Sequence, residues 1–293
     1  MTATSTSTPS SPSGDETIAT SALRRSSMGR STIAGTFLAL LLRDLTVLRK
    51  NLREFIPRTV MQPLLLVFVF TNVFPRIGQG VGGSSPQQQV LFSTLLVAGV
   101  LGTSIIFQGI QSTALPLVQE FGYTREIEDR VLAPLPVGLV AFEKIVAGAL
   151  QCIIAGLIVF PIARFVPDTT PELHIDWLVL LTLIPLACLA AAALGLMFGT
   201  VFQPRTVPLL FGVVVVPMTF LGCVYYPWSQ LDAIPWLKWA VLINPLVYIC
   251  EGFRAALTNA PHMSLWAVYL ATIGMAVGFS TIGIRFFTRR VIV

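Results

Sequence analysis

The most constraining feature of the sequence is an uncharged run at residues 177–202, which reads WLVLLTLIPLACLAAAALGLMFGTVF. As a helix, this run would rise about 39 Å, which is more than the roughly 30 Å hydrocarbon core of a bilayer. Other long apolar runs follow along the chain and are separated by short polar links. The strands of an outer-membrane barrel would instead alternate over about ten residues. The pattern therefore predicts an all-α integral membrane protein.

The composition excludes a water-soluble domain. Of the 293 residues, 54% are hydrophobic and only 11% are charged, too few to cover a soluble surface. The net charge of +5 could suggest nucleic acid, but the basic residues lie at the ends of apolar runs, where they set membrane topology. We expect contact with membrane lipids and no nucleic-acid partner. The four cysteines each stand alone in apolar sequence and are predicted to be small buried hydrophobes.

The amino-terminal region divides into two parts. Residues 1–32 are rich in Ser, Thr and Pro and carry Asp15 and Glu16 before any apolar run, which predicts a disordered cytoplasmic tail rather than a signal peptide. Residues 33–58 place apolar side chains on one helical face and basic ones on the other. Only about ten apolar residues precede Arg43, too few to cross a bilayer. This predicts an amphipathic helix along the inner membrane surface, and the alternative is a helix of a small soluble domain.

Residues 59–293 are predicted to form a domain of six transmembrane helices. A charged cytoplasmic link at residues 113–138 joins the second and third spans. The spans are predicted at residues 59–74, 90–111, 145–165, 177–202, 207–225 and 265–287. Two glycine pairs, Gly195 with Gly199 and Gly274 with Gly278, permit close helix contact. We expect these helix contacts to lie inside one bundle, and the alternative is an interface between two copies of the chain.

The distribution of basic residues orients the spans. Of the 19 Lys and Arg residues, all but Arg76, Arg164, Lys238 and Arg254 fall on one side of the predicted layout. The positive-inside rule then places both termini in the cytoplasm of a multi-pass plasma-membrane protein.

Residues 228–257 are apolar enough to suggest a seventh span, but they are broken. Between Lys238 and Glu251 there are twelve residues, which would cover only about 18 Å as a helix. Asn244 and Pro245 interrupt this piece, because proline disfavours helical geometry in the residue before it. A seventh span would also move the basic carboxyl terminus outside. The segment is therefore predicted to be a re-entrant helical hairpin that enters from outside before the last span.

Four side chains of the predicted hairpin stand out. Trp236 and Trp239 suit a membrane interface. Glu251 and Arg254 stand three residues apart and share a helical face, so they form either a gate beside the exit of a pathway or a local ion pair.

Residues 208–257 resemble the signature region of permease subunits of the type-2 ATP-binding cassette exporters, and most resemble those of the daunorubicin-resistance type. The matching features are a span with glycine and Pro217, an aromatic and proline-rich stretch at residues 226–239, Asn244-Pro245-Leu246, and an acidic residue followed by Arg254. The six-span layout and the amphipathic helix also agree with this family.

The resemblance implies partners. Such permeases pair with a second copy or a paralogous permease and bind two copies of a cytosolic ATPase subunit, which holds Mg-ATP. This chain is expected to bind no cofactor, since no lysine follows a glycine as a phosphate-binding loop requires. In the family, a charged link docks on the ATPase, and the alternative is a solvated turn. The residues predicted for this coupling are Glu120, Arg125, Glu126, Glu128, Asp129 and Arg130.

The predicted function is export of an amphiphilic drug, lipid or lipid-linked glycan. A secondary transporter or channel is one alternative, disfavoured because no middle span carries a central charge. A multi-pass membrane transferase is another, but the two histidines, His174 and His262, lie far apart in predicted external links, and no catalytic motif is present. We therefore predict no catalytic residue and no metal site.

Overall fold

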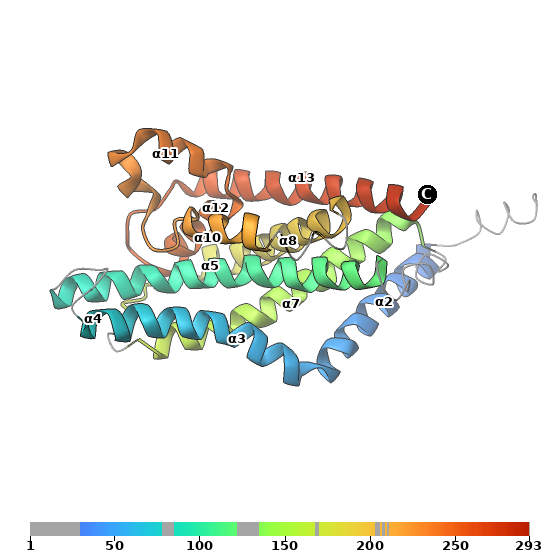
Figure 1. Cartoon of the computed structure of the whole chain (residues 1–293). Helices are drawn as coiled ribbons and strands as arrows, with labels where there is room; N and C mark the ends of the chain where they lie inside the picture. Colours follow the sequence, from blue (N-terminus) through green and yellow to red (C-terminus); the bar gives the residue numbers. More distant parts are fainter. Residues whose placement is uncertain are drawn as a thin grey trace, which may run out of the picture.

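The computed structural model of the chain describes residues 30–77, 85–121, 135–167, 170–202, 206, 209 and 211–292. Within these ranges all regular secondary structure is helical, and the long helices pack side by side in one elongated bundle (Figure 1). Five helical runs are long and apolar enough to cross a membrane, and a bent pair of shorter helices raises the number to as many as six. The predicted class, an all-α membrane protein with a bent element before its last span, is confirmed.

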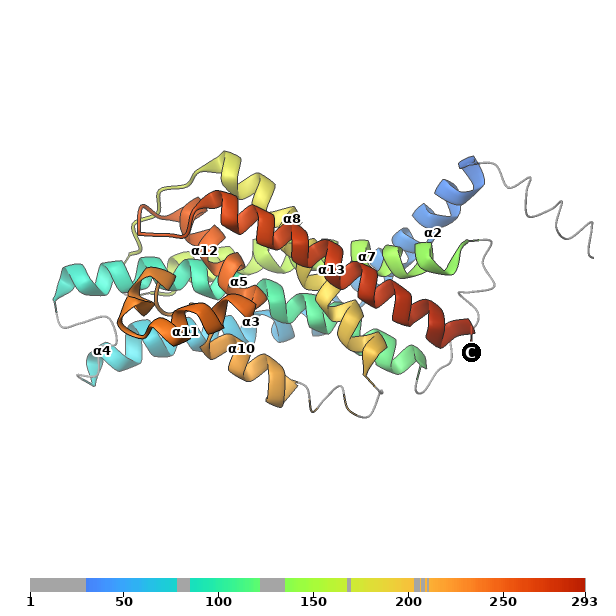
Figure 2. The ribbon, with the colours of Figure 1, turned by 90° about the horizontal axis from the view of Figure 1, so that it is seen from above.

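Six long helices form the bundle: α2 (Arg30–Lys50), α3 (Leu52–Phe68), α5 (Pro86–Gln119), α7 (Val137–Phe165), α8 (Trp177–Val201) and α13 (Leu265–Ile292). The shorter pieces are η1 (Val69–Val73), α4 (Phe74–Arg76), η3 (Phe211–Val215), α10 (Val216–Phe220), η4 (Trp228–Ala233), α11 (Pro235–Ala240), η5 (Val241–Ile243) and α12 (Pro245–Leu257). We call the end that holds α2 and the last turns of α13 the terminal end, and the end that holds α4 and α11 the hairpin end (Figures 1 and 2).

A break at Asn51 separates α2 from α3. Asn51 has φ −101° and ψ 18°, and asparagine disfavours helix interiors because its side chain competes for backbone hydrogen bonds. Helix α3 then continues through Pro57 and Pro63 and, with η1 and α4, forms one span over Leu52–Arg76. The first span thus begins inside the segment 33–58, which is two helices rather than the single amphipathic helix expected from sequence.

Two further boundaries differ from expectation. Residues 1–29 of the predicted tail lie outside the described residues, and α2 begins at Arg30. Helix α5 continues to Gln119, past the predicted end of the second span at residue 111. The polar residues near that point do not end the helix because Ser112 bonds back to the carbonyl of Gly109 at 3.3 Å. The first part of the predicted link is therefore an extension of α5.

Helices α5 and α8 form the centre of the bundle, and they approach each other through glycine. A Cβ on Gly109 would lie 2.5 Å from the backbone of Ala191, and one on Gly195 would overlap the carbonyl oxygen of Gly109. Such closeness brings two backbones into direct van der Waals contact. The Gly195 motif therefore lies inside the bundle, as expected, whereas Gly274 and Gly278 have nothing within 4 Å of an added Cβ.

The predicted fifth span, residues 207–225, is described only in part. Its described helical part, η3 and α10, covers two five-residue pieces and would rise about 15 Å, roughly half the hydrocarbon thickness. A turn begins at Leu221, where the chain leaves the helix. This segment is not among the helices long enough to span, and residues 207–208 and 210 lie outside the described residues.

The bent pair lies at the hairpin end. The piece Pro235–Ile243 meets Pro245–Leu257 at 98°, so the two cannot form one straight crossing. The chain then turns into α13, which runs back along the bundle and packs on α8 (Figure 2). This geometry agrees with the hairpin predicted from the Asn244-Pro245 break.

The contact between α5 and α8 predicts a difference between two glycines. Gly195→Ala should lower the thermal unfolding temperature of the detergent-solubilised protein, because overpacking a close contact costs about 1–3 kcal/mol. Gly274→Ala is the matched control, since an added Cβ meets nothing there. Equal unfolding temperatures for the two variants would contradict the packing described.

Candidate functional site

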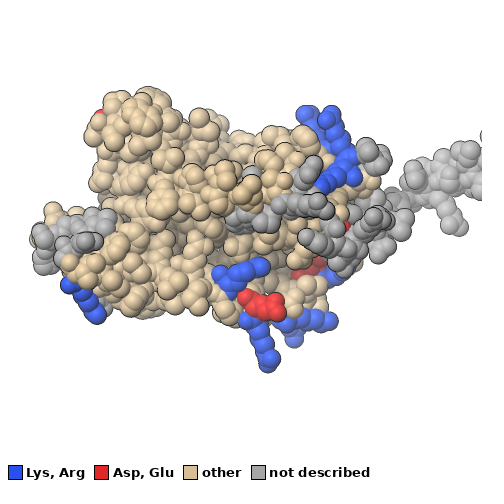
Figure 3. Space-filling model, viewed as in Figure 1, with Lys and Arg blue, Asp and Glu red and all other residues tan. Residues whose placement is uncertain are grey.

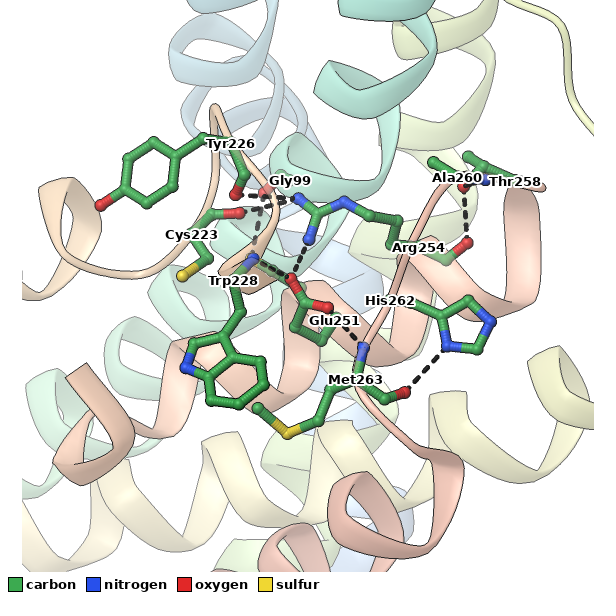
Figure 4. Close-up of polar contacts among 11 residues, drawn as sticks. Gly99, Cys223, Tyr226, Trp228, Glu251, Arg254, Thr258, Ala260, His262 and Met263 are labelled. Carbon is green, nitrogen blue, oxygen red and sulfur yellow. Dashed lines mark hydrogen bonds and ion pairs between the residues drawn. The ribbon is translucent and has the colours of Figure 1, made fainter. Parts of the chain in front are cut away.

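A buried ion pair lies at the hairpin end of the bundle. Glu251 and Arg254 sit one turn apart on α12, have no exposed surface and form a salt bridge (Figure 4). Glu251 Oε1 also accepts a hydrogen bond from the backbone N–H of Trp228 at 2.8 Å. Its Oε2 accepts one from the N–H of Met263 at 2.8 Å. The carboxylate thus holds η4 and the connection to α13 against α12.

Arg254 binds the turn that follows α10. Its Nη2 donates to the carbonyl oxygens of Cys223 at 2.8 Å and Tyr226 at 3.4 Å. Burial, and to a smaller extent the nearby Cys223 thiol, raises the pKa of the Tyr226 hydroxyl, which stays protonated and donates to the carbonyl of Phe220 at 3.2 Å. One ion pair therefore joins two separate connections to a single helix, the one between α10 and η4 and the one between α12 and α13.

The turn held by Arg254 is strained and closely packed. Cys223 has φ 53°, a left-handed conformation that is costly for a residue with a Cβ. Next to it, a Cβ on Gly99 of α5 would overlap the carbonyl oxygen of Val224. One turn further along α5, a Cβ on Gly102 would lie 2.8 Å from the Cys250 sulfur. Helix α5 can approach the hairpin only because glycine occupies both positions.

The bend itself is set by Asn244 and Pro245. The Asn244 side chain caps α12 by accepting from the N–H of Leu246 at 3.0 Å, and its amide nitrogen donates to the carbonyl of Met218 at 2.7 Å. Pro245 occupies the first helical position, where its missing N–H is not needed. These two residues thus begin α12 and attach it to α10.

Trp236 and Trp239 lie on the outer side of the hairpin. Their exposed fractions are 73% and 68%, in keeping with tryptophan at a membrane interface. Between them, Lys238 pairs with Asp232 and lies 4.3 Å from the Trp228 ring. The hairpin therefore has an exposed aromatic edge and a fully buried ionic interior. Glu251 and Arg254 form an internal ion pair, and a gating role for them stays a prediction.

A second charged cluster lies at the terminal end. Lys144, near the start of α7, has its Nζ 2.8 Å from Glu120 Oε1 and 3.3 Å from Asp44 Oδ2. Lys144 and Glu120 are buried, and Asp44 is half-buried. Three helices contribute, because Asp44 belongs to α2 and Glu120 directly follows α5. We call Asp44, Glu120 and Lys144 the three-helix junction.

The structure places only one of the predicted coupling residues. Glu120 lies in the three-helix junction, whereas Arg125, Glu126, Glu128, Asp129 and Arg130 lie outside the described residues. Sequence reasoning missed the junction, because Asp44 and Lys144 are 100 residues apart. The available signal was the position of each charged residue at the end of an apolar run. This signal does not tell which helix ends contact each other in the fold.

Two cavities mark the ends of the bundle. One of about 630 Å³ at the terminal end is lined by α2, α3, α5 and α7. One of about 570 Å³ at the hairpin end has Leu91 and Phe92 of α5 in its wall and Glu172 and His174 at its edge. Within the described ranges, no group of three or more His, Cys, Asp or Glu side chains is placed to hold a metal ion.

These observations define a class of protein. Two buried salt-bridge clusters lie near the ends of the bundle, the Glu251–Arg254 pair, which we call the hairpin clamp, and the three-helix junction. The long helices carry the apolar length of a membrane protein. The arrangement is that of a membrane-embedded transport subunit.

Comparison with known proteins identifies the family. Residues 35–258 match the ABC-2 type transporter family, and the chain belongs to it. The chain is thus a permease, the membrane subunit of an ABC transporter, and a multi-pass plasma-membrane protein.

Among curated relatives, it is similar to the inner membrane transport permease YadH of Escherichia coli K12, Escherichia coli O157:H7 and Shigella flexneri. Each is 27% identical over 202 residues, which cover 67% of this chain and 74% of the relative. Their names mention no substrate, so the resemblance to daunorubicin-resistance permeases stays a prediction.

The buried ion pair predicts a characteristic pattern of stability. Glu251→Gln or Arg254→Met should each cost about 3–5 kcal/mol, because each leaves polar groups buried without a partner. The double variant should lose less than the sum of the two. Asp232→Asn, which breaks an exposed pair in the same hairpin, is the control. Thermal unfolding in detergent measures all four variants, and additive losses would count against a coupled pair.

Proposed function

We propose that this chain is the membrane subunit of an ATP-driven exporter that moves an amphiphilic drug, lipid or lipid-linked glycan out of the cytoplasm. A separate ABC ATPase, present in two copies, would bind Mg-ATP, and this chain would bind no cofactor. Membership of the ABC-2 family carries the proposal. The absence of a Gly-Lys-Ser/Thr sequence from the chain supports a separate ATPase.

A second permease, either another copy or a paralogue, would complete the pathway. Segment η3–α10 supports this idea, because it exposes Val213, Val216 and Phe220. A partner subunit against this face would cover apolar surface and enclose a path between the two permeases. The hairpin, with Trp236 and Trp239 on its outer edge, would border the exit of that path.

The terminal end would face the cytoplasm. On the face shown in Figure 3, Lys and Arg atoms gather near the corner of α2 and α3 and near the end of α13, while the centre of the bundle has none. This agrees with the positive-inside rule. The hairpin would then dip into the membrane from outside.

This orientation is testable by labelling. The four native cysteines are buried, so a new exposed cysteine reports its own side. In intact cells, a membrane-impermeant maleimide should label Asp232→Cys in the hairpin, and it should label Arg49→Cys in α2 only after permeabilisation. The reverse pattern would overturn the proposed orientation and the direction of export with it.

The three-helix junction suggests how ATP hydrolysis would move the spans. The predicted link, residues 113–138, would dock on the ATPase, and Glu120 stands where the chain leaves α5. Because Lys144 binds both Glu120 and Asp44, a push on the link would reach α2, α5 and α7 together. A helical extension of α5 is stiff enough to transmit such a push, which a disordered loop is not.

Charge reversal in the link tests this coupling and the function together. The permease and its ABC ATPase partner are reconstituted in proteoliposomes, and ATP hydrolysis and movement of candidate amphiphiles are measured. The triple variant Glu126→Arg, Glu128→Arg, Arg130→Glu should insert normally and keep the basal rate of ATP hydrolysis. Its transport-coupled hydrolysis should fall at least about tenfold. Glu172→Arg, at the hairpin end, is the control. Wild-type protein that neither moves any amphiphile nor stimulates the ATPase would refute the proposed function.

A further inference from the structure

The cavity at the terminal end lies in the angle between α2 and α3 and is closed by α5 and α7. Its volume of about 630 Å³ is in the range of ligand sites, roughly 300–1,000 Å³. Part of its wall is apolar, formed by Val47, Leu48, Phe55, Leu115 and Pro116. The rest carries charged and amide side chains. Since α3 begins a membrane span at Leu52, the cavity lies at the depth where the span enters the membrane.

Among the described residues that line the cavity, the charges are balanced in sign. Arg43, Arg58 and Lys144 face Asp44, Glu54 and Glu120 around the cavity. Lys144 already binds Asp44 and Glu120 in the three-helix junction. A ligand with net charge would leave that charge uncompensated in a half-enclosed space beside lipid, which is costly. The lining therefore favours a ligand that carries both signs.

Two of these side chains face the cavity without a protein partner. Among the residues that the structure describes, the side chains of Glu54 and Arg58 form no hydrogen bond and no ion pair, with each other or with a third residue. They stand four residues apart on α3 and thus share one face. A negative and a positive group side by side offer separate contacts to an ammonium and a phosphate.

The same face of α3 becomes apolar further along the span. From Glu54 and Arg58 the face continues with Met61, Leu65 and Phe68, at helical spacings of three and four. These three side chains are 54%, 53% and 46% exposed. A polar stretch at the membrane entry followed by an exposed apolar stripe toward the membrane centre matches an amphiphile, with its head in the cavity and its chains along the helix.

We propose that this cavity binds the headgroup of a zwitterionic phospholipid. Arg58 contacts the phosphate, Glu54 contacts the ammonium group, and the acyl chains lie along Met61, Leu65 and Phe68. The lipid fills the angle between α2 and α3 and supports the three-helix junction. This binding is separate from the export step proposed above, and it is tested by a measurement that needs neither ATP nor transport.

The test compares lipids of equal chain length on the full-length permease, purified and delipidated in detergent. Phosphatidylethanolamine should raise the thermal unfolding temperature and stay bound in native mass spectra. Phosphatidylglycerol, which carries a net negative charge, should bind about tenfold more weakly, the scale of one lost charge-assisted contact. Free phosphoethanolamine should not stabilise the protein, because it lacks the chains that α3 contacts.

Variants on α3 separate the site from general lipid binding. Arg58→Gln should weaken phosphatidylethanolamine binding about tenfold. Glu54→Gln should shift the preference toward phosphatidylglycerol, because it leaves a net positive cavity. Arg53→Gln is the matched control, since Arg53 is on the same helix and is exposed like Arg58 but does not line the cavity.

Equal stabilisation of the wild-type protein by both lipids would overturn the proposal. An equal loss of phosphatidylethanolamine binding in Arg53→Gln and Arg58→Gln would also overturn it. The protein would then bind lipid nonspecifically around the helix rather than in the cavity.

Discussion

The structure depends on hydrogen bonds to the backbone N–H and C=O groups of a non-helical connection beside lipid. No water is available there to form these bonds. Each unsatisfied polar group would cost several kcal/mol there. Glu251 and Arg254 supply the missing partners: the carboxylate accepts from the N–H groups of Trp228 and Met263, and the guanidinium donates to the carbonyls of Cys223 and Tyr226. Because the two charges also neutralise each other, the chain can turn twice near the membrane without a long helix.

Helix α5 connects this clamp to the other end of the molecule. Gly99 and Gly102 bring α5 against the strained turn and α12, and Glu120 follows its last turn in the three-helix junction. Over these 21 residues a continuous helix rises about 32 Å, the thickness of the hydrocarbon core. One stiff element therefore contacts both charged clusters, and the close glycine contact with α8 holds it in place. In the proposed exporter, such an element would join the ATPase side to the exit.

The sequence predicted much of this and failed at identifiable points. The all-α membrane class and the bent element followed from uncharged length and from Asn244-Pro245. The boundary between α2 and α3 at Asn51 was missed, because the amphipathic pattern of residues 33–58 continues across it and predicts a single helix. The extension of α5 to Gln119 was missed because its polar residues suggested a link. The fifth predicted span counted apolar residues, but the described helix there is short.

By itself, the sequence determined that the chain lies in a membrane and that a helix breaks at Asn244-Pro245, because hydropathy and the Asn-Pro step act locally and need no neighbour. Only the tertiary structure decided that Lys144 meets Asp44 and Glu120, that Gly195 rather than Gly274 is a helix contact, and that Glu54 and Arg58 face a cavity. These facts depend on which faces of distant helices meet. Many pairings satisfy the same apolar pattern, and backbone contact and charge balance select one of them.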